Sequence, residues 1–491
     1  MRLALLSLLL CACSSAAAQE DGELRDSRQP NILYILADDL GYGEVGCYGQ
    51  TKIQTPNIDA LAASGMRFTQ HYSGSPVCAP SRCVLLTGLH TGHSVVRDNW
   101  ERGGWEKDAP EGQYPLPTGT VTLARELQSA GYNTSVIGKW GLGGPGTTGH
   151  PNEQGFDHFF GYLCQRWAHN YYPDHLWRNA DRVELAGNEY FKAHQKIEAP
   201  LSSEGDYWER YTGETYAPDA MIAEAEEFIR ASADEPFFLL FASPVPHAAL
   251  QVPPADLDQY PEAWDAEHYL GQRSYLPHPS PRRTYAAMVS RFDRDIGRLL
   301  DVLDALNLAS DTIVMFSSDN GPTFNGGTDS KFFDSAAGLS GLKCSVLEGG
   351  LRVPFIVRYP EHVEAGSISS VVSGFQDVLP TVLELTGAPA VADIDGISLV
   401  PTLLGGKEQR VHDALYWEYR GQQALRMGDW KALRRKLKAG SDRMELYHLL
   451  RDPSESTDVA DQHPALVERF AAEMASRRFP STDFPLALID D

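Results

Sequence analysis

The sequence predicts an α/β protein in which a large mixed, mostly parallel sheet is sandwiched by helices and is followed by a small antiparallel sheet with one helix. From residue 30 to about 405, short apolar, β-branched runs alternate with helical patterns, as in sheets covered on both faces. After a polar, Gly-rich break near residue 405, strand-like runs follow one another and one helical pattern closes the chain. With 491 residues, 42% hydrophobic and 22% charged, the chain can bury a large core, which excludes a disordered or collagen-like protein.

The individual elements follow from the apolar runs and the residues that bound them. Five runs bounded by Pro, Gly or polar residues are expected as buried strands at 31–37, 133–137, 237–242, 312–316 and 355–359. Helical patterns, two of them ending at a glycine, predict helices at 58–64, 123–130, 219–231, 285–306 and 376–385. Further strands are expected at 412–420, 423–427, 430–434 and 444–448, with a helix at 464–477. These elements predict a large domain over 30–405 and a small α+β subdomain over 411–491.

The N-terminus has the pattern of an export signal over residues 1–18. A positive n-region precedes about ten apolar residues and a run of small residues. Cleavage after Ala18 and cleavage before Cys13, as in a bacterial lipoprotein, both fit this pattern. The apolar run is shorter than the ~20 residues that span a bilayer, so no transmembrane span is expected. We therefore expect a periplasmic or secreted protein that uses the export machinery, with a lipid anchor on Cys13 as the alternative.

Net charge and cysteine usage narrow the function classes. Lys plus Arg total 42 against 66 for Asp plus Glu, and the net charge of −24 opposes binding to nucleic acid. The basic run at 431–438 is interpreted as a solvated hairpin face. Five cysteines lie outside the leader, an odd number without Cys-x-x-Cys spacing, which gives little support to a zinc site or a dense disulfide framework.

Polar side chains follow four of the predicted strands. In open α/β sheets, ligands bind beyond the carboxyl ends of the strands, so these residues are candidates for a site. Three carboxylates and one amide among them offer hard oxygen ligands, which favour Ca²⁺ or Mg²⁺ over zinc. The alternative for either pair of acids is a capping or turn role. The residues are Asp38, Asp39, Lys139, His247, Asp319 and Asn320.

One segment resembles the signature of a known family. Residues 78–88 read CAPSRCVLLTG, which resembles the Cys-x-Pro-Ser-Arg motif and the following Leu-x-Thr-Gly of type I sulfatases. Other segments match this family in the same order: PNIL and ADDLG within 30–41, TPNID at 55–59, GKW at 138–140, SDNG at 318–321, EGGLRVP at 348–354, GDWK at 428–431 and ELY at 445–447. The resemblance covers essentially the whole mature chain and implies the alkaline-phosphatase-like fold, with residues 30–405 as the catalytic domain.

The resemblance also implies roles for the candidate residues. Cys78 would be oxidised to formylglycine by a formylglycine-generating or an anaerobic sulfatase-maturing enzyme. Residue 78 would hold Ca²⁺, or alternatively Mg²⁺, together with Asp38, Asp39, Asp319 and Asn320. Four further residues complete the implied site: Arg82 to hold the formylglycine hydroxyl, Lys139 and Lys343 to clamp sulfate, and His247 to protonate the leaving alcohol.

In the implied reaction, one hydroxyl of the hydrated aldehyde attacks sulfur and the second then expels sulfate. The family usually has His in GKWHLG, where this chain reads GKWGLG with Gly141. That His contacts the formylglycine and assists sulfate expulsion in relatives. Among nearby histidines, His90, His93 and His150, we take His93 as the first choice to replace it.

An aromatic stretch over 156–177 is either core or a wall on which a sugar packs. With Trp100, Trp105 and Trp167 it would bind substrate beside Lys139, His247 and Lys343. The expected substrate is a sulfated small molecule or glycan, with a galactose-type 4-sulfate as the specific expectation. A phosphonate or phosphodiester hydrolase of the same fold and a non-catalytic binder of sulfated glycans are the alternatives.

Overall fold

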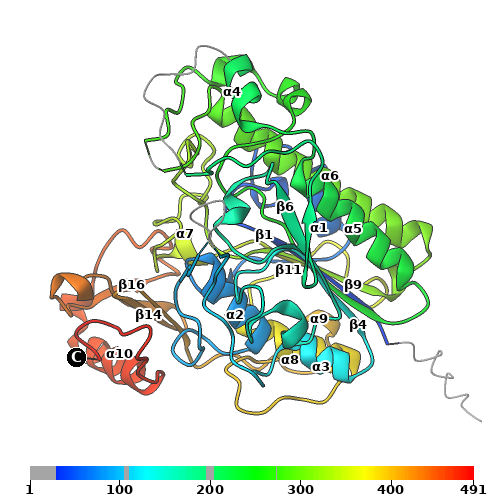
Figure 1. The fold of residues 1–491 in the computed structure, drawn as a ribbon. Helices are drawn as coiled ribbons and strands as arrows, with labels where there is room; N and C mark the ends of the chain where they lie inside the picture. The colour runs from blue at the N-terminus through cyan, green and yellow to red at the C-terminus, as the bar shows by residue number, and fades with distance from the viewer. Residues whose placement is uncertain (1–28, 104–109, 195–203, 273, 491) are drawn as a thin grey trace, which may run out of the picture.

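The computed structural model describes residues 29–103, 110–194, 204–272 and 274–490. Its main sheet has ten strands in the order β11-β2-β10-β9-β1-β8-β4-β5-β6-β7 (Figure 1). The five central strands, β9-β1-β8-β4-β5, are parallel, whereas β10 runs antiparallel to β9 and β6 runs antiparallel to β5. The strands are β1 Asn31–Ala37, β2 Met66–Phe68, β4 Asn133–Lys139, β5 His158–Tyr162, β6 His175–Arg178, β7 Asp181–Glu184, β8 Phe237–Ala242, β9 Thr312–Ser318, β10 Phe355–Arg358 and β11 Ser367–Ser369. Two short strands, β3 His71–Tyr72 and β12 Ser373–Gly374, pair with each other.

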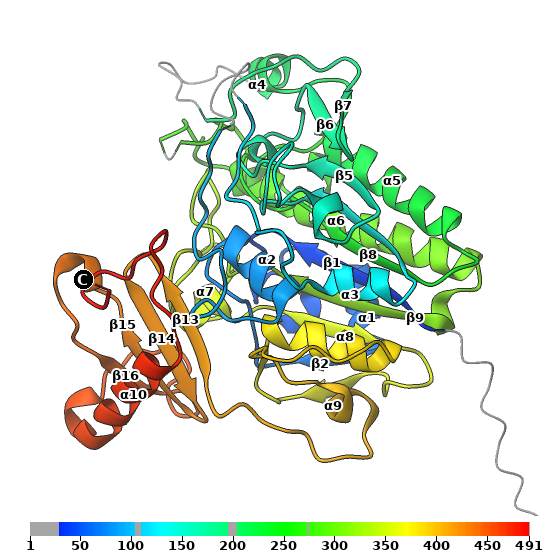
Figure 2. The same ribbon diagram turned by 60° about the horizontal axis from the view of Figure 1, so that its bottom comes forward.

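Helices cover both faces of the sheet, which explains why the central strands are apolar without alternation. In β1, Leu33 and Ile35 pack into one core, and Ile32 and Tyr34 pack into the other. One face is covered by α1 Pro56–Ala63, α5 Ala217–Ala231 and α6 Pro281–Ala305. The other face is covered by α2 Cys78–Thr87, α3 Leu123–Ser129, α8 Val378–Thr386 and α9 Val400–Leu404 (Figure 2). Two further helices, α4 Glu204–Tyr211 and α7 Glu348–Leu351, lie outside these layers.

The C-terminal part is an antiparallel sheet with one helix. Its strands β13 Leu415–Tyr419, β14 Gln422–Met427, β15 Trp430–Arg434 and β16 Glu445–His448 pair in chain order, and α10 Pro464–Ser476 follows. Phe470 and Met474 of α10 pack on one face of this sheet. The opposite face carries Trp417, which packs with Tyr72 of the large part. The two parts therefore share a core cluster.

The predicted fold class is confirmed, and most predicted elements lie within a few residues of the observed ones. The run at 355–359 is a strand, but it is antiparallel to its neighbours. The interpretation of 431–438 as a solvated face is wrong at Lys431, which is fully buried between Glu348 and Glu455 at 2.9 and 3.0 Å. Within the described part of the chain, no helix is long and apolar enough to cross a membrane. The predicted signal at 1–18 lies outside the described residues.

Candidate active site

Three strand ends and one helix start bring most of the candidate residues together. Asp38 and Asp39 follow β1, Lys139 ends β4, and Asp319 follows β9. Cys78 is the first residue of α2. Because β1, β4, β8 and β9 are parallel, their carboxyl ends meet at one edge of the sheet. The local chain turns sharply there, since Asp39 adopts a left-handed backbone with φ of 67°.

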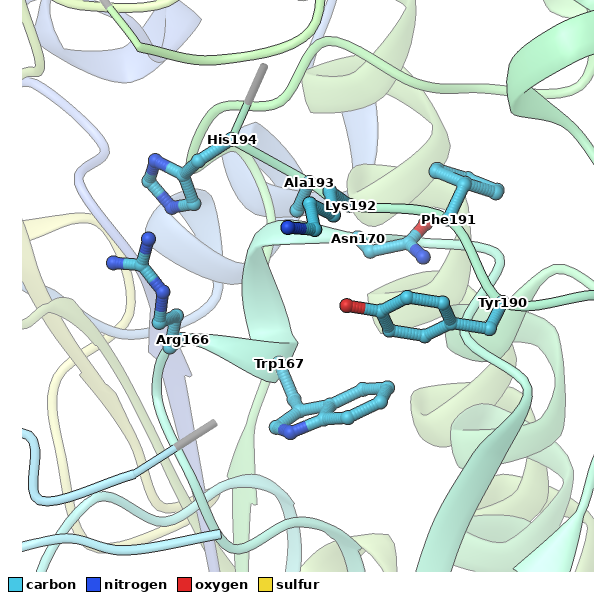
Figure 3. Close-up of a pocket in the computed structure, with 8 residues that line it drawn as sticks. All are labelled: Arg166, Trp167, Asn170, Tyr190, Phe191, Lys192, Ala193 and His194. Carbon is cyan, nitrogen blue, oxygen red and sulfur yellow. The ribbon is translucent and has the colours of Figure 1, made fainter. Parts of the chain in front are cut away.

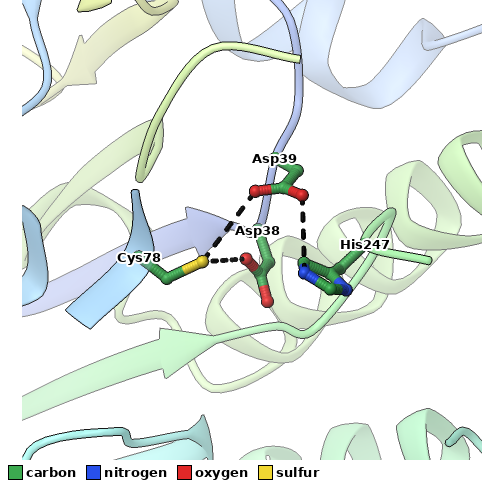
Figure 4. A group of neighbouring side chains, drawn as sticks. All are labelled: Asp38, Asp39, Cys78 and His247. Atoms are coloured by element: carbon green, nitrogen blue, oxygen red, sulfur yellow. Dashed lines mark hydrogen bonds and ion pairs between the residues drawn. The ribbon is translucent and has the colours of Figure 1, made fainter. Parts of the chain in front are cut away.

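Cys78 lies at the centre of this group and is fully buried. Its Sγ is 3.2 Å from Asp38 Oδ1 and 3.9 Å from Asp39 Oδ1 (Figure 4). The Nζ atom of Lys343 lies 3.7 Å from the same sulfur. Burial, and then the charge of Asp38, raises the pKa of the Cys78 thiol well above 9.0. The unmodified thiol is therefore protonated at neutral pH and is a poor nucleophile.

Three cations are buried with the carboxylates. Lys139 Nζ donates to Asp38 Oδ2 at 2.6 Å, and Lys343 Nζ donates to Asp39 Oδ2 at 2.7 Å. One turn after Cys78, Arg82 donates from Nε and Nη2 to Asp319 Oδ2 at 3.0 and 2.9 Å. Formally the three positive charges balance the three negative ones, so the group is neutral before any ligand binds.

The pKa shifts in the group reflect this pairing. Burial alone would raise the pKa of Asp38, but Lys139, His247 and Arg82 together lower it below its usual value. Burial, and then the charge of Asp38, raises the pKa of Asp319 to about 7. Two adjacent carboxylates of this kind are costly to keep ionised without a further cation.

The residues present fit a divalent cation. Asn320 donates from Nδ2 to Asp39 Oδ1 at 2.7 Å and to the Gly321 carbonyl at 2.9 Å. These bonds fix the orientation of the amide, and its Oδ1 is a fully buried acceptor with no hydrogen-bond partner among the residues that the structure describes. An orphaned oxygen beside three carboxylates is a ligand set for Ca²⁺ or Mg²⁺.

His247 lies against Asp39 and is held in one tautomer. Its Nδ1 donates to the Ala248 carbonyl, so Nε2 carries the lone pair and lies 3.5 Å from Asp39 Oδ2. Burial, and then the charge of Lys343, lowers the pKa of His247 to about 3. The ring is therefore neutral at pH 7, and it has to gain a proton before it can act as a general acid.

Sequence reasoning missed His169, which follows β5 in the aromatic stretch. Its ring stacks on that of His247 with centroids 4.4 Å apart and planes 4° apart. Nothing in the sequence pairs these two histidines, because they are 78 positions apart and meet only through the fold. His169 is therefore an additional residue of the site.

The space beside Gly141 is filled by Gln165. Gly141 has φ of 84°, and a Cβ there would lie 2.8 Å from Gln165 Cγ. The buried Gln165 amide points to Asn99, whose Oδ1 is 3.5 Å from Gln165 Nε2 and accepts the Ala79 N–H at 2.9 Å. An amide pair therefore reaches the first turn of α2, next to Cys78.

The histidine expected to replace the one missing at Gly141 lies elsewhere. His93 binds Asp395 at 2.9 Å and packs on Phe479, so the structure does not support our first choice. His90 also pairs with Asp395, at 3.4 Å, and His150 lies 3.2 Å from the Asn179 carbonyl.

The predicted aromatic wall is divided. Trp167 is buried, whereas Trp100 is 38% exposed and stacks on Tyr114 with centroids 5.4 Å apart. Trp105 lies outside the described residues. Among the described ring contacts, Trp100 and Trp167 have different partners and do not contact each other. They therefore do not form one continuous wall.

Comparison with known proteins identifies the family. Residues 30–388 match the family model described as Sulfatase, and residues 342–478 match the one described as N-sulphoglucosamine sulphohydrolase, C-terminal. An N-acetylgalactosamine-6-O-sulfatase of Bacteroides thetaiotaomicron is 30% identical over 95% of this chain and 96% of its own length. The human N-acetylgalactosamine-6-sulfatase is 31% identical over 82% of this chain and 71% of its own.

A solved structure agrees with these relatives. The structure of Ps i-CgsB in complex with k-i-k-neocarrahexaose has a TM-score of 0.72 and 29% identity, covering 92% of this chain and 93% of that one. The match of the large domain to one family model, together with the site geometry at the sheet edge, leads to one assignment. The chain belongs to the sulfatase family of the alkaline phosphatase superfamily and is a sulfuric ester hydrolase.

Proposed function

We propose that this protein removes sulfate from a carbohydrate sulfate monoester, using a formylglycine made from Cys78 and a Ca²⁺ or Mg²⁺ ion. The observation that carries the proposal is the fully buried group around Cys78 Sγ, in which three carboxylates, an orphaned amide oxygen and three cations converge. Asp38, Asp39, Asp319 and Asn320 would hold the ion.

Charge balance supports an anionic substrate at this site. The three cations and the three carboxylates of the site formally cancel, so a bound divalent ion would make the site locally positive in a chain whose net charge is −24. A sulfate monoester carries one negative charge on its equatorial oxygens. The ammonium groups of Lys139 and Lys343 are positioned to neutralise these oxygens, as cationic clamps do in phosphoryl transfer.

Because the buried thiol of Cys78 is protonated and is a poor nucleophile, we infer that residue 78 acts only after modification. When present, a hydrated formylglycine would supply one hydroxyl as the nucleophile and a second hydroxyl through which residue 78 is regenerated. Arg82 lies on the same helical face one turn later and orients residue 78. The lone pair on His247 Nε2 would accept the proton that the attacking hydroxyl gives up and would return it to the leaving alcohol oxygen.

The substrate proposal rests on the relatives. Two of them are named for N-acetylgalactosamine 6-sulfate, and a solved relative holds a neocarrahexaose. We propose a galactose-type sugar as the substrate. The names of these relatives favour position 6 for the sulfate. Our expectation of a 4-sulfate remains a prediction, which turnover of galactose 6-sulfate and galactose 4-sulfate tests.

Two accompanying proposals concern the export of the chain and the enzyme that modifies Cys78. Residues 1–18 would direct export to the periplasm or beyond, with lipid attachment at Cys13 as the alternative. A formylglycine-generating or anaerobic sulfatase-maturing enzyme would act on Cys78. Intact mass of the mature protein from its native host tests both, because cleavage and each modification change the mass in a distinct way.

The decisive experiment combines mass analysis of the peptide containing Cys78 with turnover of galactose 6-sulfate, galactose 4-sulfate and a matched pair of aryl sulfate and aryl phosphodiester. We expect an aldehyde or its hydrate at position 78 and release of sulfate. Cys78→Ala should abolish turnover, whereas Cys83→Ala, a change at a buried cysteine of the same helix, serves as the matched control. An unmodified thiol in fully active protein would refute the formylglycine proposal. Preferred cleavage of the phosphodiester, or sugar binding without turnover, would favour one of the two alternatives.

A further inference from the structure

Two side chains that reach the buried carboxylates, those of His247 and Lys343, are held in different ways. His247 is supported within the large part of the chain, because the His169 ring stacks on it. Next to His169, two segments of the large part line a small recess, with side chains that include Arg166, Trp167 and Lys192 (Figure 3). The support of Lys343 comes instead from the C-terminal part.

Lys343 lies on a long loop. Residues 319–347, all of which the structure describes, contain no helix or strand and connect β9 to α7. The Lys343 ammonium nevertheless has a defined place, with Nζ 2.7 Å from Asp39 Oδ2 and 3.7 Å from Cys78 Sγ. Loops of this length are where several conformations usually coexist, and the stem of a lysine is itself flexible. Contacts with other segments are therefore needed to hold the backbone of this loop.

The C-terminal sheet binds this loop through the side chain of Gln422. Gln422 is the first residue of β14, and its Nε2 donates to the Cys344 carbonyl at 2.8 Å. Its Oε1 accepts the N–H of Val346 in a longer bond of 3.4 Å. An amide side chain offers one donor end and one acceptor end, which is what these two backbone groups require. One side chain thus binds the backbone directly after Lys343 at two points.

The backbone that Gln422 binds is in an unfavourable conformation. Cys344 has φ of 69°, in the left-handed region that residues with a Cβ rarely adopt. Such a residue persists only where the surrounding contacts over-determine its conformation. The second such contact is the Pro76 carbonyl, which accepts the Cys344 N–H at 2.9 Å. Gln422 and Pro76 therefore hold the residue next to Lys343 from two sides, and Pro76 lies two positions before Cys78.

Packing and a second polar contact join the same segments. Val346 is fully buried in a core cluster that contains Tyr419 of β13, and the Tyr419 hydroxyl lies 3.7 Å from Cys344 Sγ. At the end of the loop, the N–H of Glu348 in α7 donates to Glu455 Oε2 at 2.6 Å. In both ribbon views α7 lies beside the C-terminal sheet (Figure 1, Figure 2). The C-terminal part therefore contacts the chain both directly after Lys343 and at the start of α7.

We propose that Gln422 is a positioning residue, through which the C-terminal sheet holds the Lys343 ammonium against Asp39. The inference rests on the proposed function, in which Lys343 neutralises the sulfate oxygens. Gln422 acts through the loop backbone at residues 344 and 346. Misplacement of a reacting group by about 1 Å can lower a rate by about a hundredfold. Loss of one of several anchors should cost less than that, about tenfold.

The first test compares substitutions at two neighbouring glutamines. Gln422→Leu keeps a side chain of similar size and removes both hydrogen bonds to the loop. We expect its kcat/KM to fall about tenfold on galactose 6-sulfate or galactose 4-sulfate, whichever the wild type cleaves. Gln423→Leu is the matched control, because Gln423 donates to the Tyr416 hydroxyl at 2.9 Å and accepts from Arg434 Nη1 at 3.0 Å, within the C-terminal sheet. This control should lower the stability of the protein and leave kcat/KM of the folded enzyme unchanged. A kcat/KM of Gln422→Leu equal to that of the wild type would overturn the inference.

The second test separates positioning of Lys343 from a general loss of structure. Gln422→Leu is introduced into the Lys343→Ala variant, whose residual turnover is measured at high enzyme concentration. If Gln422 acts through Lys343, its substitution should change kcat/KM by less than about twofold there, because two residues that act as a unit are not additive. A general structural effect would lower kcat/KM by the same factor in both backgrounds. A tenfold loss in the Lys343→Ala background would therefore overturn the inference.

The failure of this inference differs from the failure of the proposed function. Absence of turnover by the wild type on every sulfate ester would contradict the proposed function. In that case crystal structures of the wild type and of Gln422→Leu test the position of Lys343 without turnover. Displacement of Nζ from Asp39 in the variant alone would support the inference. An unchanged separation of Nζ from Asp39 in the variant would overturn it.

Discussion

Replacing Gly141 with alanine tests whether Gln165 fills the place of a side chain at this position. The added Cβ would lie 2.8 Å from Gln165 Cγ and 2.9 Å from Cδ and Nε2, closer than real Cβ contacts. The loop that contains Gly141 also contains Gly146, whose φ of 68° is similar but whose added Cβ would meet nothing within 4 Å. The two glycines therefore separate the clash with Gln165 from the backbone conformation.

The expected magnitudes follow from these two contributions. A left-handed backbone costs a non-glycine residue about 1–2 kcal/mol, and both substitutions carry this cost. Overpacking against a buried side chain adds about 1–3 kcal/mol at position 141 only. Gly141→Ala should lower the free energy of unfolding by about 2–5 kcal/mol and Gly146→Ala by about 1–2 kcal/mol, which combines the two ranges.

Denaturant unfolding of both variants measures this difference, and the double variant Gly141→Ala with Gln165→Ala checks its cause. Removing the Gln165 side chain should recover most of the extra loss, since the new methyl group then fills part of the vacated space. Sulfatase turnover measured in parallel reports on the contact from Gln165 through Asn99 to Ala79, beside Cys78. Equal destabilisation by the two single substitutions would refute the packing argument.

Three further predictions concern the ion site, the domain contact and pH. Chelation should lower the melting temperature of the wild type, because an ion present at a hundredfold excess over its Kd stabilises the folded protein by about 2.7 kcal/mol. In Asn320→Ala, chelation should lower the melting temperature by less. Equal decreases in the two proteins would argue against an ion at Asn320. Lys431→Met should cost about 3–5 kcal/mol, since it leaves the Glu455 carboxylate buried without its cation and leaves Glu348 paired with Arg352 alone. The exposed Lys438→Met should be nearly neutral in the same unfolding assay. Burial lowers the pKa of His278 from 6.5 to about 3, so between these pH values the unfolded chain binds a proton that the folded chain does not. The contribution of His278 to the free energy of unfolding is therefore complete above pH 6.5 and is lost as the pH falls toward 3. The stability of His278→Gln should depend less on pH over this range. A pH dependence equal to that of the wild type would contradict the lowered pKa of His278.

Elements buried on both faces could be predicted from their own residues. The strands β1 and β8 match the predicted 31–37 and 237–242 because uninterrupted apolar runs end where the chain reaches the edge of the core. Side chains that follow such strands are brought to one edge by parallel pairing alone. The convergence of Asp38, Lys139 and Asp319 could therefore be anticipated, and the motif around Cys78 pointed to the chemistry.

Features that depend on pairing between distant segments could not be predicted in this way. The apolar run of β10 resembles those of the parallel strands, so its own residues do not show its direction. Only its pairing with β9 and β2 shows that it is antiparallel to both. Strands of two or three residues, such as β3 and β12, are too short to show a period. Lys431 has the composition of a surface residue and is buried because its two carboxylate partners come from other parts of the chain.

The fold class, the order of the central elements and the set of residues at the sheet edge could be predicted from the amino-acid sequence, since they depend on local hydrophobicity and on where the strands end. The structure was needed to show that Gln165 occupies the space beside Gly141, that His169 stacks on His247 and that Arg166 and Lys192 share a recess with Trp167. Each of these contacts joins segments whose separation along the chain carries no local signal, because side-chain packing across loops is set by the closed fold and not by the pattern of any one segment.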